Sequence, residues 1–70
     1  MVNNYTTLIQ KNDYWWTGWI EEIPGVNCQE ATYDELLITL KITLQEALDF
    51  NRHDAISFAG NNYKEETIAL

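Results

Sequence analysis

A single long amphipathic stretch that begins at Thr32 is the feature that most constrains the fold of this chain. At 100° per residue its apolar positions fall on one broad face, the pattern of a helix that packs on a sheet. The residues on this face are Tyr33, Leu36, Leu37, Leu40, Leu44, Ala47 and Leu48. Thr32 and Glu35 have the capping-box spacing, in which each side chain satisfies a free backbone N–H at the helix start. The pattern predicts a helix from Thr32 to about Asn51, and one helix can cover only one face of a sheet.

Three short segments before this helix have the composition of β-strands. Residues 5–11 and 14–22 are rich in β-branched and aromatic residues, and a tight turn joins them. Pro24 and Gly25 close the second segment, because proline fixes φ and glycine accepts a positive φ. Residues 26–30 are long enough for a third strand.

The sequence after the helix predicts one more strand. Residues 52–62 are typical of a connection, in which 55–59 can form a helical turn, and residues 63–70 alternate as a strand does. A helix between two strands of one sheet is normally a right-handed crossover, which would place the last strand parallel to the first and beside it. We therefore expect a single α+β domain over residues 1–70, with β-β-β-α-β order and one helix covering one sheet in two layers.

Tryptophans in the second strand cannot all be covered by one helix. Adjacent residues of a strand point to opposite faces, so Trp15 and Trp19 share one face while Trp16, Gly18 and Ile20 share the other. At least one tryptophan therefore lies on the uncovered side. Two explanations remain open, namely shielding by the connection after the helix, or contact with another protein.

Two isoleucines fall on the helix face opposite the apolar stripe. Ile38 and Ile42 are spaced i, i+4, so their side chains meet. Isolated exposed isoleucines are ordinary. Two in register indicate a contact seam, with chance as the alternative.

The chain is small for a protein that folds without help. It has 70 residues, one cysteine and one histidine, so it can neither close an internal disulfide nor supply a four-ligand structural zinc site. A core of this size rarely contributes more than about 3–5 kcal/mol. We therefore expect association, either with itself as a homodimer or homotetramer or with another protein.

The net charge of −7 indicates the sign of a partner. The four Lys and Arg residues are scattered, whereas nucleic-acid binding depends on gathered cations, so we expect no direct nucleic-acid binding. An acidic chain suits a basic protein partner. No apolar run approaches the length of a membrane span and the N-terminus has no signal-peptide pattern, so we expect a cytoplasmic protein without membrane contact.

The sequence contains no recognisable catalytic set. Ser57, His53 and Cys28 are isolated, and their spacing places no nucleophile beside a base. We expect no enzymatic activity, no cofactor and no metal. His53 follows the expected helix end, where a cation favours the helix dipole. Cys28 fits the role of a small buried apolar residue.

Acidic residues gather near the Pro24 turn and the helix start. They are Glu21, Glu22, Glu30, Asp34 and Glu35. A solvated acidic rim and an electrostatic docking edge are the two explanations that this pattern leaves open.

Four motifs follow one another along most of the chain. They are Tyr5-Thr6, Trp15-Trp16, Glu-Ile-Pro-Gly-Val at 22–26 and Gln-x-x-Thr-x-x-Glu at 29–35, followed by the leucine-rich helix. In this order and spacing, residues 5–48 resemble the HicB family of antitoxins. The resemblance implies a partial RNase H-like fold and a protein that binds and occludes a small basic HicA-type toxin, an mRNA interferase.

Two other properties of such folds are not expected here. Fuller family members carry a C-terminal DNA-binding segment, for which a chain ending at Leu70 has no room. RNase H chemistry requires acidic residues that project from the central strand to hold two metal ions. Residues 5–11 contain no Asp or Glu, so the fold resemblance implies no nuclease.

These observations favour an antitoxin-like interaction protein. Its candidate partner-binding residues are Trp15, Trp19, Glu21, Glu22, Ile38 and Ile42, and its structural residues at the turn and helix start are Pro24, Gly25, Thr32 and Glu35. The alternative is a stand-alone oligomeric regulatory or scaffold protein with the same fold and no toxin partner. A transcription factor would need a basic recognition helix, but Lys41 is the only interior cation of the expected helix.

Overall fold

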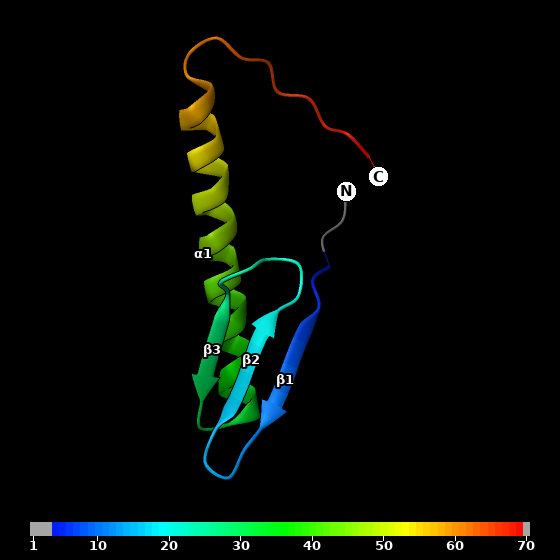
Figure 1. Ribbon diagram of the computed structural model, residues 1–70, viewed down its shortest axis with the longest axis vertical. Coiled ribbons are helices and arrows are strands. Elements are labelled where there is room, and N and C mark those ends of the chain that lie inside the picture. Colours follow the sequence, from blue (N-terminus) through cyan, green and yellow to red (C-terminus); the bar gives the residue numbers. More distant parts are fainter. Residues whose placement is uncertain (1–3, 70) are drawn as a thin grey trace.

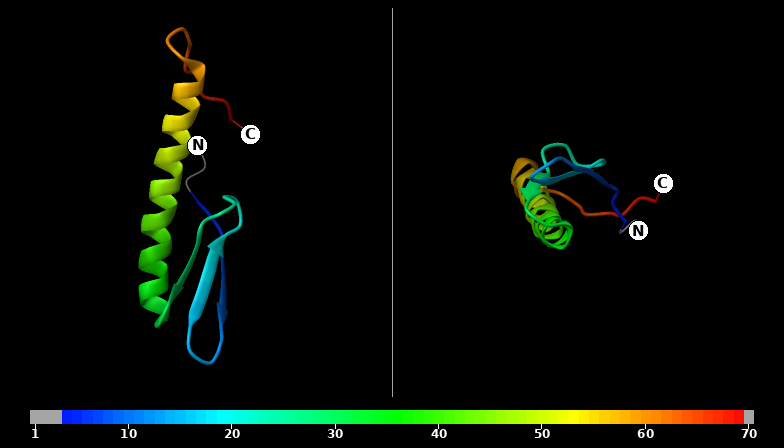
Figure 2. Two further views of the ribbon diagram at one scale, coloured as in Figure 1. Left: turned by 60° about the vertical axis from the view of Figure 1, so that its left-hand side comes forward. Right: turned by 90° about the horizontal axis from the view of Figure 1, so that it is seen from below.

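The computed structural model describes residues 4–69 (Figure 1). Three strands come first, β1 (Thr7–Lys11), β2 (Trp16–Ile20) and β3 (Asn27–Glu30), and one helix follows, α1 (Tyr33–Ala59). The strands form an antiparallel sheet in the order β1-β2-β3, and α1 lies against one face of it (Figure 2). The described chain is therefore a small two-layer α+β fold, and the three predicted strands and the predicted helix are confirmed, each strand shorter than expected.

Local interactions explain the two turns of the sheet. The side-chain Oδ1 of Asn12 accepts hydrogen bonds from the backbone N–H groups of Tyr14 and Trp15, at 3.0 and 2.7 Å, and so shapes the β1–β2 hairpin. Gly25 follows Pro24 with a φ of 89°, a conformation that favours glycine. The turn predicted at Pro24 and Gly25 is confirmed.

The helix begins where the capping pattern predicted. Thr32 is the N-cap, and its Oγ1 accepts a hydrogen bond from the backbone N–H of Glu35 at 3.2 Å. The Glu35 carboxylate accepts a hydrogen bond from the Thr32 hydroxyl at 2.8 Å instead of binding a backbone N–H. Half of the predicted capping box is therefore formed. Asp34 and Glu35 add negative charge at the positive end of the helix dipole.

The core lies between α1 and the sheet and is small. Its fully buried side chains are Ile20, Val26, Leu36 and Leu40. Partly buried neighbours surround them, namely Ile9, Trp16, Ile23, Cys28, Leu44 and Ala47. Cys28 packs against this core as predicted, and its Sγ donates a hydrogen bond to Thr43 Oγ1 at 3.4 Å. The packing depends on Gly18, because a Cβ at that position would lie 2.8 Å from Leu40 Cδ1.

The helix does not end near Asn51 but continues to Ala59, so that part of the prediction is wrong. Between Tyr33 and Ala59 the sequence contains neither glycine nor proline, and polar residues such as His53 are compatible with an exposed helix. Gly60 ends the helix with a φ of 77°, and its backbone N–H donates a hydrogen bond into the last turn at 3.2 Å. The connection expected over residues 52–62 is therefore mostly helix, and His53 lies within α1 and not beyond its end.

The last strand predicted over residues 63–70 is absent from the described residues, because 63–69 pair with no strand and Leu70 lies outside the description. The length of α1 explains this difference. Its 27 residues span about 40 Å, whereas a five-residue strand spans about 17 Å, so the chain leaves the helix far beyond the sheet (Figure 1).

The return path to the sheet uses most of the residues that follow α1. Leu44 lies beside the residues that lead into β1, and from Ala59 back to that level is about 22 Å along α1. Residues 60–69 span at most about 33 Å when extended. Only a few residues would be left to pair with β1. The expected β-β-β-α-β order is therefore wrong for residues 4–69, whose order is β-β-β-α.

The molecule is elongated, with principal extents of 52 × 23 × 16 Å. Its radius of gyration is 15.3 Å, whereas a compact chain of this length has about 11 Å. The accessible surface is 6176 Å², about a third more than the roughly 4,500 Å² expected for a compact protein of 8.2 kDa. A surplus of this size is comparable to what a protein–protein interface buries.

Candidate interaction surfaces

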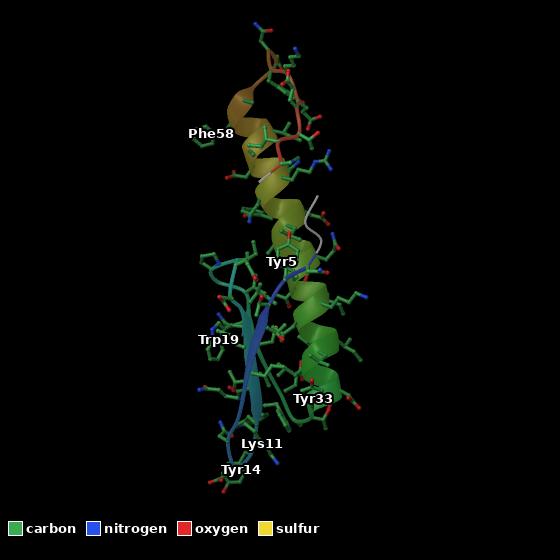
Figure 3. The ribbon with its side chains drawn as sticks, turned by 90° about the vertical axis from the view of Figure 1, so that its right-hand side faces the viewer. Tyr5, Lys11, Tyr14, Trp19, Tyr33 and Phe58 are labelled. Carbon is green, nitrogen blue, oxygen red and sulfur yellow. The ribbon has the colours of Figure 1, made fainter. Side chains whose placement is uncertain are left out.

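The face of the sheet that points away from α1 carries the first candidate surface, which we call the open sheet face. Trp19 lies on this face (Figure 3), and in the register of the sheet it is opposite Leu8 of β1. Leu8 is 40% exposed and Trp19 is half-buried. By strand alternation, the same face carries the polar residues Gln10, Thr17, Asn27 and Gln29. An apolar centre with a polar surround is the usual composition of a protein interface.

The other tryptophans differ in how they are covered. Trp16 lies on the helix side, where its ring meets Tyr33 edge to face, with centroids 5.3 Å apart and an interplanar angle of 71°. Trp15 precedes β2 in the hairpin turn and is 44% exposed. Residues 52–59 run away from the sheet within α1, so the predicted alternative of shielding by a connection is wrong (Figure 1). Trp15 and Trp19 remain available to a partner.

The outer face of α1 carries the second candidate surface, the outer helix seam, formed by Ile38 and Ile42. These side chains are 61% and 56% exposed. They lie on the side of α1 opposite the buried Leu36 and Leu40, so they point away from the sheet. The outer helix seam and the open sheet face therefore lie on opposite sides of the molecule, and the structure does not bring the predicted contact residues into one site.

The C-terminal half of α1 adds apolar surface that the sequence pattern did not reveal. Phe50 and Phe58 are 67% and 90% exposed, and Phe58 lies on the part of α1 that extends beyond the sheet (Figure 3). The signal that could have indicated this was the lack of any helix-breaking residue before Gly60.

The loop after β2 separates the roles of its two glutamates. The Glu22 carboxylate accepts hydrogen bonds from the Thr6 hydroxyl at 2.7 Å and from the Thr6 backbone N–H at 2.8 Å. These bonds, the one from the hydroxyl first, lower the pKa of Glu22. Glu22 therefore ties this loop to the start of β1. Glu21 is exposed, and its carboxylate makes no hydrogen bond within the described residues.

Other members of the acidic cluster also have local partners. Glu30 accepts a hydrogen bond from the Thr39 hydroxyl at 2.7 Å, and Glu35 is engaged with Thr32. Pro24 and Gly25 are exposed at the tip of the loop. Among the predicted contact carboxylates, Glu21 is thus the one that a partner could engage without disturbing a bond of the fold.

We expect Glu22→Gln to reduce the dependence of stability on acid pH. The pKa of Glu22 is lowered from its ordinary 4.5, so its hydrogen bonds stabilise the fold above that pH and are lost as the pH falls through the lowered value. Urea unfolding between neutral pH and about pH 3 measures this dependence. Wild type should be the more stable protein at neutral pH, and the difference should vanish at the acid end.

Glu21→Gln is the matched control, since it removes the same charge from the neighbouring residue. It should keep the pH dependence of the wild type. Identical pH dependence in all three proteins would contradict the role given to the Glu22–Thr6 contact.

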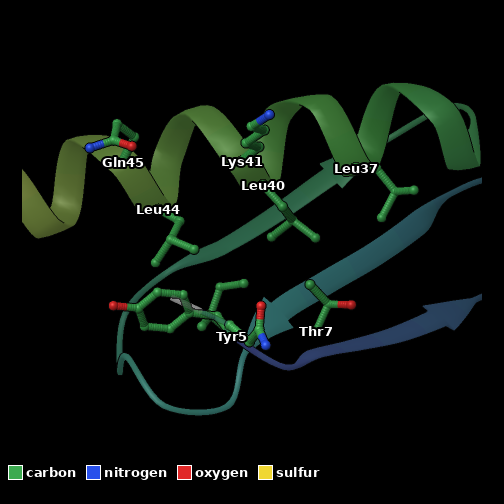
Figure 4. Close-up of a pocket in the computed structure, with 9 residues that line it drawn as sticks. Tyr5, Thr7, Leu37, Leu40, Lys41, Leu44 and Gln45 are labelled. Carbon is green, nitrogen blue, oxygen red and sulfur yellow. The ribbon is translucent and has the colours of Figure 1, made fainter. Parts of the chain in front are cut away.

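A groove lies between α1 and the chain that leads into β1 (Figure 4). Its volume is about 330 Å³, and we call it the edge groove. Its lining includes Tyr5, Thr7, Leu37, Lys41 and Leu44. Among the described residues that line it there is no Ser, Cys, His, Asp or Glu, so these residues offer apolar contact and one cation, without a general base.

Two further findings concern residues 4–69. No three His, Cys, Asp or Glu side chains converge there to hold a metal ion. No helix there is both long and apolar enough to cross a bilayer. Comparison of the chain with protein-family descriptions, with curated proteins and with solved structures finds no match.

Proposed function

We propose that this protein is an antitoxin-like interaction protein of the HicB kind, which binds and occludes a small basic HicA-type mRNA interferase toxin. The observation that carries the proposal is the open sheet face, where α1 covers neither the half-buried Trp19 nor the exposed Leu8, in a chain of net charge −7. A large apolar group on a strongly acidic protein suits a basic partner, because charge speeds encounter while the buried aromatic group supplies affinity.

The fold supports this proposal through its element order. Three antiparallel strands followed by one helix agree with the first four elements that the HicB resemblance implies. The partial RNase H-like character of the sheet and a cytoplasmic location, where mRNA interferases act, belong to the proposal. In this function the protein acts by occlusion and catalyses nothing.

The docking surface in this proposal is the open sheet face together with Glu21. Glu21 follows Trp19 by two residues at the end of β2, so strand alternation places it on the same side of the sheet. Its carboxylate is free to pair with a cation of the partner. Trp15, at the other end of β2, extends the aromatic surface.

Co-expression with the adjacent short basic reading frame tests the proposal. The neighbour alone should arrest growth, this protein should relieve the arrest, and the two should co-purify. Trp19→Ala should weaken binding about 30-fold or more, as expected for the loss of an aromatic hot spot.

Ile42→Ala is the matched control, because it removes apolar surface from the opposite side of the molecule. It should leave the affinity unchanged. A neighbour that is harmless alone, or that fails to co-purify, would refute the toxin role. Loss of binding in Ile42→Ala but not in Trp19→Ala would move the docking surface to α1.

A stand-alone oligomeric regulatory or scaffold protein is the second candidate function. The observation that favours it is exposed apolar surface on α1, at Ile38, Ile42 and Phe50. A second copy could cover this surface with no basic partner. Under this candidate a homodimer or homotetramer forms from the isolated chain, and Ile42→Asp lowers its mass in equilibrium sedimentation.

A further inference from the structure

The helix covers the sheet unevenly. α1 packs on β2 and β3, but within the described residues no Cα of α1 lies within 8 Å of a Cα of β1. Figure 2 shows the helix displaced toward the β3 side of the sheet. The helix-facing side of β1 is therefore only partly covered: Ile9 packs against the core, and the edge groove lies beside Thr7.

The apolar lining of the edge groove is incompletely covered. Tyr5 and Leu37 are exposed and Leu44 is half-buried, although all three side chains face the groove (Figure 4). Leu37 and Leu44 belong to the apolar stripe of α1 that also contains Leu40, and Tyr5 lies in the segment that leads into β1. The core thus continues into a space that this chain does not fill.

The outer edge of β1 is also unpaired within residues 4–69, since β1 is the first strand of the sheet order β1-β2-β3. Thr6 O accepts a hydrogen bond from Glu21 N at 2.9 Å, which fixes the alternation of the strand. Backbone groups of Leu8 and Gln10 therefore face β2, and those of Thr7, Ile9 and Lys11 face the open edge.

Nothing in the sequence of β1 blocks the pairing of this edge. Natural edge strands are protected by proline, by inward charges, by bulges or by a covering helix. β1 reads Thr-Leu-Ile-Gln-Lys, with its single charge at the last residue, and its Lys11 Nζ lies 5.4 Å from the Trp16 ring centroid. The opposite edge, β3, is packed under α1.

We propose that β1 pairs with β1 of a second copy of this chain, antiparallel about a two-fold axis at Ile9. Ile9 then faces its own counterpart, Thr7 faces Lys11 of the second copy, and the two sheets join into one of six strands. Both helices lie on the same side of this sheet, and the two edge grooves lie on that side at opposite ends of the paired strands. An isologous contact of this kind closes on itself and leaves neither β1 edge free.

Charge favours a second copy over a basic protein at this edge. The cations near it are Lys11 at the end of β1 and Lys41 in the groove lining, and both would repel a basic partner. The antiparallel arrangement places the Lys11 end of each strand against the Thr6 end of the other. The two Lys11 side chains then lie at opposite ends of the paired strands and do not face each other.

This contact rests on the self-association given above as the second candidate function, and it specifies the surface involved. It leaves the open sheet face free for the basic partner. Its failure and the failure of the proposed function are therefore separable. Loss of the toxin partner does not affect the dimer, and a dimer that forms through α1 refutes this contact alone.

Thr7→Pro tests the edge. Proline removes an outward backbone N–H that has no partner within residues 4–69, and the exposed Thr7 side chain leaves room for the ring. Equilibrium sedimentation should show a dimer for wild type and a dissociation constant raised about 30-fold or more for the variant. Far-UV circular dichroism of the dissociated variant should retain the helix of α1.

Gln29→Pro is the matched control, because Gln29 is an exposed residue with outward backbone groups on the other edge strand, β3. It should dimerise as wild type does. A wild type that is monomeric at about 100 μM, or a Thr7→Pro variant that dimerises like Gln29→Pro, would overturn the proposal.

Cysteine pairing tests the register without relying on proline. With the axis at Ile9, Leu8 of one copy faces Gln10 of the other as a non-hydrogen-bonded pair, close enough for a disulfide. Leu8→Cys and Gln10→Cys, each combined with Cys28→Ser, should cross-link when mixed and oxidised, and much less when either is oxidised alone. Equal cross-linking in all three samples, or capture of a basic partner at this edge, would overturn the contact.

Discussion

Leu40→Ala is expected to leave the isolated chain largely unfolded. Leu40 is 1% exposed and is one of four fully buried side chains that lie between α1 and the sheet. Truncation of a buried leucine costs about 2–5 kcal/mol, and a core in a chain of this length rarely contributes more than about 3–5 kcal/mol. The loss is therefore comparable to the whole stability. Circular dichroism with urea titration measures it.

Ile38→Ala is the control for this substitution. It shortens a β-branched side chain on the same helix, at a position that is 61% exposed. The free energy of unfolding should change by no more than about 0.5 kcal/mol. Equal losses in the two variants would mean that α1 does not pack on the sheet through the Leu36–Leu40 face.

The elements up to the middle of α1 could be predicted because their signals are local. The Thr32 cap, the first-turn carboxylates and the leucine spacing together define a helix start, and the Pro24-Gly25 pair defines a turn. These signals act over a few residues and do not depend on the rest of the fold.

The end of the helix was not predictable from the polarity of residues 51–54. Those residues resemble a connection because no sheet lies beside them and they need no apolar face. A helix that leaves the sheet loses its amphipathic pattern before it loses its backbone hydrogen bonds. The helix ends at Gly60, which is the first residue after the helix start that favours a positive φ.

The last strand was predicted wrongly because the length of the helix before it was predicted wrongly. A helix that ends near Asn51 would bring residues 63–70 beside β1, but one that ends at Ala59 uses most of the following residues on the way back to the sheet. Alternation in residues 63–70 is therefore a weak signal when the connection before it is misjudged.

The candidate contact residues were predictable in part. Strand alternation correctly separated Trp19 from Trp16, although it did not tell which of the two faces the helix covers. Helical periodicity correctly placed Ile38 and Ile42 on the outer face of α1. Sequence could not reveal that Glu22 is bound to Thr6, because that contact joins residues 16 positions apart. Nor could it reveal that α1 covers β1 only in part, which depends on how the helix lies across the sheet.

The surfaces of this chain separate by charge. The β1 edge with its groove carries Lys11 and Lys41, and the open sheet face is bordered by Glu21. A second copy and a basic partner can thus bind at the same time, one along the sheet edge and one on the sheet face. An acidic protein that must both self-associate and hold a basic partner needs such a division, because one surface cannot favour both signs of charge.

Gly18→Ala is expected to cost about 1–3 kcal/mol, and Leu40→Ala is expected to offset part of that loss. A Cβ at Gly18 would lie 2.8 Å from Leu40 Cδ1 and 3.2 Å from Leu36 Cδ2, so these buried side chains, or α1 with them, would have to shift away from β2. Removal of the Leu40 methyl groups leaves a hole that the new methyl group partly fills. The double variant should therefore lose less than the sum of the single losses, by about 0.5–3 kcal/mol.

Gly25→Ala separates this packing effect from a general intolerance of alanine at glycine positions. Gly25 has a φ of 89° and no atom within 4 Å of a Cβ built there, so its cost arises from the backbone alone. Combined with Leu40→Ala, it should give an additive loss. Urea unfolding with sucrose in every sample, which stabilises the weakest variants, measures the two cycles. Additivity in both would mean that the glycine of β2 does not set the distance between the helix and the sheet, whereas coupling at Gly18 alone would show that Gly18 and Leu40 together set the depth of the core.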